Sequence, residues 1–247
     1  MNRNFDFVWD FPTKFASSAG GVASNSPSSE VYHGALFISA HSLSPKLNNL
    51  LTFAGTAPFS EPETKAIKWV MDSYPKIRYF VDLHSYAGDV LYSWGSDENQ
   101  SKYPYMNFMN STYNSVRGVL TDTPGTGKGY GEYTPTAEFN INKGVGQSMG
   151  SAMSAVAART YSVTPAADLY PTSGASDDYS YSRHFANTAL NLVHGYTIEF
   201  GFGNSASSCP FYPTVSQYNT NLKESAAGFM ELLLAAVSNG LGDTVTC

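Results

Sequence analysis

The 247-residue sequence is poor in cysteine and in charge. Its two cysteines, Cys209 and Cys247, are too few for a disulfide framework and lack the Cys-x-x-Cys spacing of a zinc or redox site. The two cysteines either form one disulfide or are two free thiols, and the sequence leaves both alternatives open. The chain has 14 Lys and Arg against 20 Asp and Glu, with no run of basic residues. Because nucleic acid is bound through clustered positive charge, we expect no nucleic-acid partner.

Long apolar runs are also absent. The most apolar stretch, Phe229 to Val237, contains Glu231 and is far shorter than the roughly 20 residues that span a bilayer. We therefore expect no membrane partner, and the first residues have neither the basic nor the apolar part of a secretory signal. Hydrophobic residues nevertheless make up 42% of the chain, enough for one sizeable core. The composition predicts a single globular domain over residues 1–247.

Local patterns predict alternating helices and strands. Residues 60–63 have the Ser-x-x-Glu spacing of a capping box, and Pro62 lies in the first turn, so we predict a helix over 61–74. The alternating, β-forming segment 79–83 predicts a strand that leads into His84. A helix and a strand joined by a short turn indicate α/β layers.

The segment 196–200 predicts a second strand. Side chains alternate between the two faces of a strand, so Tyr196, Ile198 and Phe200 share the apolar face. We expect Glu199 to point away from that face.

Two further helices and two long connections complete the expected pattern. One helix is predicted over 145–160, and a closing helix should end near Gly240. The connections at 95–143 and 162–182 are rich in Tyr, Ser, Thr, Gly and Pro, and we expect functional residues there. One stripe of the closing helix is formed by Leu222, Ala226, Phe229, Met230, Leu233 and Val237.

Three positions could carry chemistry, although each has a structural alternative. An imidazole at a strand end, as at His84, suits a metal ligand, a general base or a purely structural role. The adjacent Asp177 and Asp178 are either functional carboxylates or a turn or helix cap. Desolvation by aromatic neighbours would raise the pKa of Glu199, which suits a general base, although a Glu without a catalytic role is also common on an edge strand. None of these residues decides the function alone.

Taken in order, five segments resemble the zinc metallocarboxypeptidases of the carboxypeptidase A/B type. This resemblance implies a three-layer α/β/α domain with a mixed, largely parallel twisted sheet. It also implies peptides or proteins with a free C-terminus as substrates, and an extracellular or vacuolar location. The segments are Asn2-Arg3-Asn4-Phe5, Ser60-Glu61-Pro62-Glu63-Thr64, Asp82-Leu83-His84-Ser85-Tyr86, Leu169-Tyr170-Pro171 with Ser173-Gly174 and Ser176-Asp177-Asp178, and Thr197-Ile198-Glu199.

The resemblance assigns a role to each matched residue. His84 would be one imidazole ligand of a catalytic zinc, and Glu199 would be the general base for the zinc-bound water. Arg3 would pair with the C-terminal carboxylate of the peptide, assisted by Asn2, and Tyr170 would fold over the bound residue. The upstream subsite would be lined by Ser85 and Tyr86.

Asp177 occupies the position that matches the floor of the pocket for the residue to be removed. A carboxylate at the bottom of a closed pocket favours a cationic partner, because an unpaired buried charge costs several kcal/mol. We therefore expect a preference for C-terminal Lys and Arg, as in carboxypeptidase B.

The chain departs from the family pattern in two places. Family members carry a His-x-x-Glu pair before the Asn-Arg-Asn segment, and none of the five histidines here is followed by Glu at the third position. The resemblance therefore implies a domain that lacks its N-terminal part and two of its three zinc ligands, with reduced or no activity. Residues 35–55 match nothing in the family, and we interpret them as an insertion or as an unspliced segment translated in frame.

Two alternatives to an active enzyme belong to other classes. The first is a catalytically inactive domain that binds peptide C-terminal carboxylates through Asn2, Arg3 and Tyr170. The second is a carbohydrate-binding domain, since exposed aromatic rings can stack on sugars and the chain has 17 tyrosines.

Overall fold

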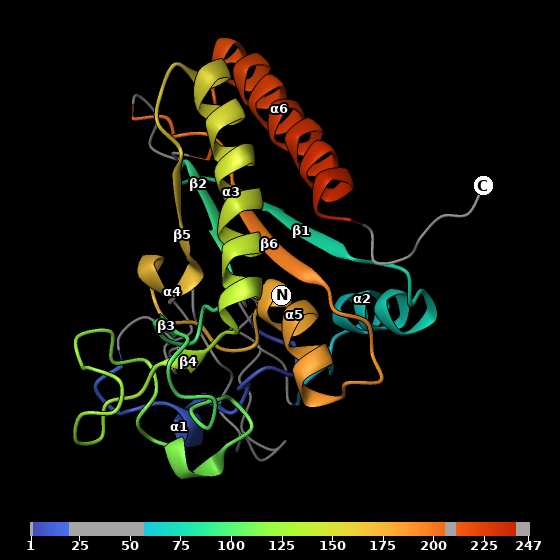
Figure 1. Ribbon diagram of the computed structural model, residues 1–247. Coiled ribbons are helices and arrows are strands. Elements are labelled where there is room, and N and C mark those ends of the chain that lie inside the picture. Colours follow the sequence, from blue (N-terminus) through green and yellow to red (C-terminus); the bar gives the residue numbers. More distant parts are fainter. Residues whose placement is uncertain (1, 20–56, 206–210, 241–247) are drawn as a thin grey trace, which may run out of the picture.

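The computed structural model describes residues 2–19, 57–205 and 211–240. The residues 35–55, Cys209 and Cys247 lie outside these ranges, so the interpretations made for them stay predictions. In chain order the elements are α1 (Phe11–Lys14), α2 (Pro62–Ser73), β1 (Tyr79–His84), β2 (Asp89–Tyr92), β3 (Asn99–Gln100), η1 (Ser111–Tyr113), β4 (Glu132–Tyr133), α3 (Thr136–Ala157), β5 (Ser162–Pro165), α4 (Ala166–Leu169), α5 (Ser176–Ala186), β6 (His194–Glu199) and α6 (Val215–Asn239) (Figure 1).

Four strands form the central sheet in the order β1, β6, β2, β5. Strands β1 and β6 are parallel, as are β2 and β5, whereas β2 and β6 run antiparallel. The sheet is thus mixed with two parallel pairings of three, as the resemblance implies. Both predicted strands, β1 and β6, are confirmed because a period-two pattern is a local property of the chain.

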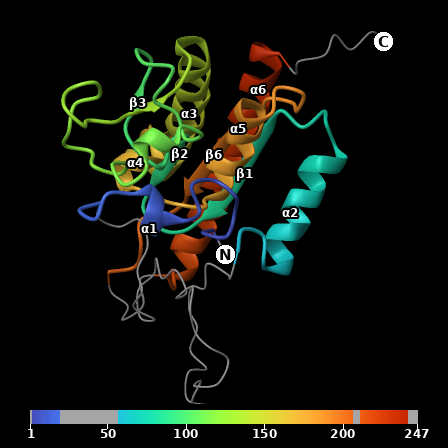
Figure 2. The ribbon, with the colours of Figure 1, turned by 90° about the horizontal axis from the view of Figure 1, so that it is seen from below.

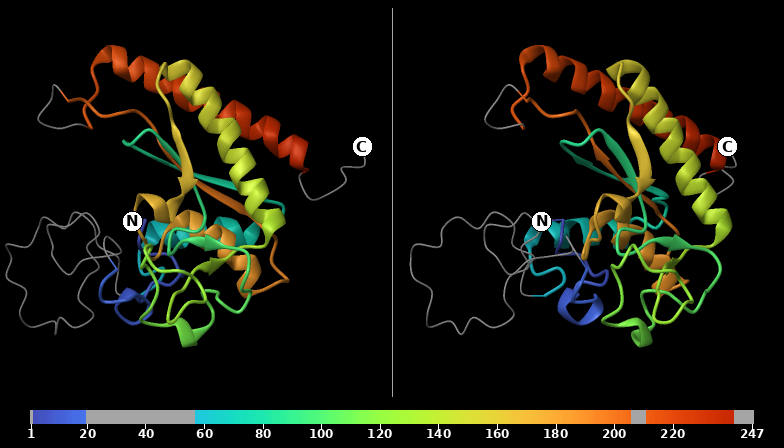
Figure 3. Two further views of the ribbon diagram at one scale, coloured as in Figure 1. Left: turned by 60° about the vertical axis from the view of Figure 1, so that its left-hand side comes forward. Right: turned by 90° about the vertical axis from the view of Figure 1, so that its left-hand side faces the viewer.

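Helices cover both faces of this sheet. Figure 3 shows α3 and α6 side by side on one face, with α5 on the other. Figure 2 shows α2 on one side of the molecule and the long connection that carries β3 on the opposite side. The arrangement confirms the expected three-layer α/β/α architecture.

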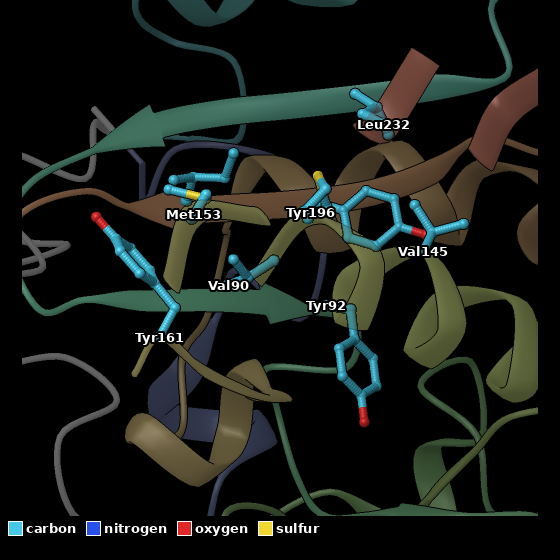
Figure 4. Close-up of a cluster of buried hydrophobic side chains, with 9 residues drawn as sticks. Val90, Tyr92, Val145, Met153, Tyr161, Tyr196 and Leu232 are labelled. Carbon is cyan, nitrogen blue, oxygen red and sulfur yellow. The ribbon is translucent and has the colours of Figure 1, made fainter. Parts of the chain in front are cut away.

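The main core lies between the sheet and the pair α3 and α6 (Figure 4). Tyr196 and Ile198 of β6 are both fully buried in it, beside Met149 and Met153 of α3. Thr197 and Glu199 point to the opposite face, as the alternation predicts. The strand therefore presents its carboxylate on the side of α5.

The predicted capping box at the start of α2 is wrong. The N-cap is Glu61 rather than Ser60, and its side chain makes no cap hydrogen bond. The buried Asn4 replaces the box, since its Oδ1 accepts hydrogen bonds from Glu61 N at 3.2 Å and from Thr64 Oγ1 at 2.6 Å. A long-range partner thus satisfies the helix start.

Helix α6 ends at Asn239 with Gly240 as its C-cap, as predicted, but its apolar stripe faces outward. Met230, Leu233 and Val237 are exposed, while the side turned to the core carries Gly228 and Leu232. The helix is apolar on two faces, so periodicity alone could not decide which one is buried.

The long connections contain more regular structure than expected. Helix α3 begins at Thr136, nine residues before the predicted start at 145, and η1 and two short strands lie in the remainder. Similarly, β5, α4 and most of α5 lie within 162–182. No helix among the described residues is long and apolar enough to cross a bilayer.

Candidate active site

His84 and Glu199 end neighbouring parallel strands. They are register partners of β1 and β6, and His84 Nδ1 lies 3.4 Å from Glu199 Oε1. Parallel strands that end together place their last side chains at one sheet edge, which is where open α/β sheets bind ligands. Two of the predicted site residues therefore meet as direct neighbours.

Asp82 is a site residue that the sequence analysis did not single out. Its Oδ2 lies 3.0 Å from His84 Nε2, so both ring nitrogens face carboxylates. Burial alone would lower the pKa of His84, but the interactions with Asp82 and Glu199 outweigh it and raise the pKa to about 10. The position two residues before His84, on the same face of the strand, is the signal that could have found Asp82.

The N-terminal segment brings two further predicted residues to this edge. It is held in place by Phe5 N–H, which donates to Gly174 O at 3.1 Å. Asn2 Oδ1 accepts a hydrogen bond from Ser176 N at 2.6 Å, and Asn2 Nδ2 lies 3.4 Å from His84 Nε2. Asn2 thereby joins the start of α5 to the end of β1.

Arg3 and Tyr170 contact each other beside these residues. Arg3 Nη2 donates to the Tyr170 hydroxyl at 3.3 Å, and the guanidinium carbon lies 5.8 Å from the centroid of that ring. Arg3 Nη1 donates to the backbone carbonyl of Asn2. Among the described residues, none accepts a hydrogen bond from the buried Arg3 Nε. The guanidinium thus keeps a donor that an entering anion could satisfy.

Asp177 lies in the first turn of α5 and is only 2% exposed. Burial raises the pKa of its carboxyl, and the charge of Asp82 raises it further. The neighbouring Asp178 has another role, since both of its carboxylate oxygens accept from Gly95 N at 3.0 Å. Both residues lie in the first turn of α5, but its N-cap is Ala175 and makes no side-chain cap hydrogen bond, so neither carboxylate is the helix cap that the sequence left open.

A small cavity of about 40 Å³ connects these residues. Ser85 and Tyr86 do not line it and instead border a neighbouring cavity of about 750 Å³ beside α6. The structure thus brings together six of the eight predicted site residues. The small cavity is lined by Asn2, Arg3, His84, Leu91, Ala166, Leu169, Tyr170, Thr172, Ala175, Asp177, Thr197 and Glu199.

The residues can be compared with the needs of a zinc ion. A catalytic zinc takes three protein ligands and keeps one position open. His84 supplies one imidazole, but in the described part of the chain no three His, Cys, Asp or Glu side chains are arranged to hold a metal. The described residues therefore fit one ligand of a zinc site and do not fit a complete site.

Comparison with known proteins places this geometry in a family. The sequence model of the zinc carboxypeptidases matches residues 1–228. The chain belongs to the zinc carboxypeptidase family. The strand ends, the small cavity and the pair of Arg3 and Tyr170 all lie within the matched range.

Individual carboxypeptidases resemble this zinc carboxypeptidase chain over part of its length. Carboxypeptidase B of Helicoverpa zea is 31% identical over 102 residues, which are 41% of this chain and 17% of that protein. Carboxypeptidase O of Bos taurus is 30% identical over 132 residues, or 53% of this chain and 26% of that protein. The matches thus span about a quarter or less of these relatives.

Solved structures share the fold of this zinc carboxypeptidase chain. Bovine thrombin-activatable fibrinolysis inhibitor, in complex with tick carboxypeptidase inhibitor, superimposes with a TM-score of 0.56 at 18% identity. That match covers 97% of this chain and 57% of the other. A second structure of thrombin-activatable fibrinolysis inhibitor gives a TM-score of 0.55, and the match covers 42% of that chain.

Proposed function

We propose that this protein acts on peptides with a free C-terminus and that the residues around its small cavity contact the last residue of the peptide. The observation that carries the proposal is the pair of Arg3 and Tyr170 at the cavity, with the Arg3 Nε lacking an acceptor in the described residues. A guanidinium presents its N–H groups as a fork that matches a carboxylate. Such a site recognises chain ends and excludes internal peptide bonds.

The remaining cavity residues have complementary roles in this proposal. Asn2 assists Arg3 in binding the terminal carboxylate, and Tyr170 closes over the bound residue. Glu199 is the general base that takes a proton from water and passes it to the leaving amine. Its position at a strand end, beside His84, supports this role.

For the residue that is removed, we propose a basic side chain. Asp177 lines the cavity and is nearly inaccessible to water, so an ammonium or guanidinium group would relieve its burial cost. Ser85 and Tyr86, on the separate larger cavity, would contact the peptide upstream of the cleaved bond. We also propose that the protein is exported and has an extracellular or vacuolar location.

Hydrolysis in this family depends on a zinc ion, which supplies an activated water when it is bound. His84 would be one ligand, and the described residues supply no complete set. We therefore propose that the chain by itself hydrolyses peptides slowly or not at all. The family function and the activity of this chain are separate proposals, and they need separate measurements.

The test compares hydrolysis and binding with the same peptides. Peptides that end in Lys, Arg or Phe are incubated with the 247-residue chain, with and without added zinc and with a chelator. In parallel, titration calorimetry measures binding of the same peptides and of their C-terminal amides. We expect tighter binding of the Lys and Arg peptides and a large loss on amidation. Equal binding of acids and amides would reject carboxylate recognition, and equal handling of Lys and Phe peptides would reject the basic preference.

A binding domain without catalysis is the second candidate, and the incomplete set of metal ligands among the described residues favours it. Such a domain would bind peptide carboxylates with micromolar affinity and would not respond to chelator. Chelator-sensitive hydrolysis would exclude it.

A further inference from the structure

We infer that Asp82 is a positioning residue that holds the His84 ring and the start of helix α5 through a single carboxylate oxygen. Oδ2 of Asp82 lies 3.0 Å from His84 Nε2 and also accepts a hydrogen bond from Ser176 Oγ. Ser176 is the first residue of α5 and directly precedes Asp177. One atom therefore connects the sheet edge to the helix that carries the proposed specificity residue.

The geometry determines how the ring is held. An ionised carboxylate only accepts hydrogen bonds, so His84 Nε2 must carry the proton shared with Asp82. Nδ1 is the other ring nitrogen, and it lies 3.4 Å from Glu199 Oε1. A carboxylate that accepts from one ring nitrogen of a histidine fixes the orientation of the ring.

The strand supplies a reason for the placement of Asp82. Residues two apart on a strand project from the same face, so Asp82 and His84 both point toward α5. Glu199 approaches the ring from β6, and Asn2 Nδ2 comes within 3.4 Å of Nε2 from the N-terminal segment. Asp82 is the nearest of these groups to a ring nitrogen and contacts two elements.

The inference rests on the proposed function for its catalytic consequence only, because the ring contact can be measured without substrate. The experiment records the ring N–H signals of His84 by ¹H–¹⁵N NMR at one fixed pH in the labelled 247-residue chain. The variants are Asp82→Ala, Asp82→Asn and Ser176→Ala. Asp89→Asn is the matched control, because Asp89 is a carboxylate on β2 in register with Glu199 and bonds to Ser162.

We expect a downfield, slowly exchanging Nε2–H signal in the wild type, in Ser176→Ala and in Asp89→Asn. Asp82→Ala should lose this signal, and Asp82→Asn should retain it at a weaker shift because an amide oxygen still accepts. An unchanged signal in Asp82→Ala, or an equal loss in Asp89→Asn, would overturn the inference. If Asp82→Ala does not fold, Asp82→Asn decides alone, and an Nε2–H shift equal to that of the wild type would reject the contact.

The catalytic consequence is measured separately wherever the wild type turns over peptides. Loss of an outer carboxylate partner of this kind lowers activity by roughly 10- to 100-fold. We expect that loss in kcat for Asp82→Ala, with a smaller change in KM. A wild type that neither binds nor cleaves peptides would reject the proposed function, while the NMR result would still decide the role of Asp82.

Discussion

The guanidinium of Arg3 lies against the ring of Tyr170, although 167 positions separate the two residues in the chain. Both residues line the small cavity. The contact exists because the N-terminal segment pairs with the backbone at Gly174, just before α5. A residue near the chain start thereby becomes part of a site at the strand ends.

Replacement of Arg3 should abolish most of the recognition of peptide C-termini. Hydrogen bonds to a charged group contribute about 1.5–3 kcal/mol, so Arg3→Ala should weaken peptide binding by roughly 10- to 100-fold. Arg3→Lys should keep only part of the binding affinity, because an ammonium group lacks the planar fork of a guanidinium. Calorimetry with peptide acids and their amides measures the effect. The same loss for acid and amide would show that Arg3 acts on the fold and not on the carboxylate.

Replacement of Asp177 should change which C-terminal residues are accepted. Removal of one partner of a buried charge pair costs about 2–5 kcal/mol, so Asp177→Ser should weaken binding of Lys and Arg peptides by at least about 30-fold. Binding of a Phe peptide should stay equal or improve, since a buried carboxylate no longer opposes an apolar side chain. The ratio of Lys to Phe affinities is the readout. An unchanged ratio would contradict the assignment of Asp177 to the pocket.

Glu132 should make stability depend on pH. Burial raises the pKa of its carboxyl from 4.5 to about 7, and hydrogen bonds from Tyr130 and Phe108 N–H offset only part of this. The folded state then binds the proton more tightly than the unfolded state. The contribution to the free energy of unfolding is present below pH 4.5 and is lost as the pH rises through about 7.

The substitution Glu132→Gln isolates this contribution. Gln keeps an acceptor oxygen and does not ionise, so the variant should lose less stability than the wild type between pH 4.5 and 7. Urea unfolding at several pH values measures how the free energy of unfolding of each protein changes with pH. If the free energy of unfolding changed equally with pH in the two proteins, the raised pKa of Glu132 would be contradicted.

Gly195 should tolerate no side chain, because helix α5 approaches β6 closely there. A Cβ at this position would lie 2.2 Å from the Asp177 carbonyl oxygen and 2.5 Å from Ser180 Oγ. Since the nearest atom belongs to the backbone, Gly195→Ala should destabilise the fold by about 1–3 kcal/mol and displace Asp177. The matched control is Gly144→Ala on α3, where no atom lies within 4 Å and helix propensity predicts a gain of up to about 1 kcal/mol. Equal urea midpoints for the two variants would contradict the close approach.

Strand patterns were predicted well because they depend on neighbours in the chain. Alternation over 196–200 located β6 and placed Glu199 on the face away from the core. The strand that ends at His84 was found in the same way. By contrast, the start of α2 depends on Asn4, and nothing in the Ser-x-x-Glu spacing reveals a partner from the N-terminal segment.

Helices were harder to place for a physical reason. Both faces of α6 are apolar, so the buried face follows from close packing of Gly228 against Met153 and not from hydrophobicity. Helix α5 is short and polar, and it was hidden within a segment read as a connection. Its eight buried residues are covered by the sheet on one side and, at Tyr179 and Tyr181, by a cluster that includes Phe5 and Trp94.

The amino-acid order alone established the presence of two strands, the direction of Glu199 and the segments that mark a zinc carboxypeptidase. Only the folded chain could join Arg3 to Tyr170, set Asp82 between His84 and Ser176, and move Ser85 and Tyr86 to a separate cavity. The first group follows from periods of two residues and from short motifs. The second depends on contacts between distant segments, which arise only when the sheet and its helices pack together.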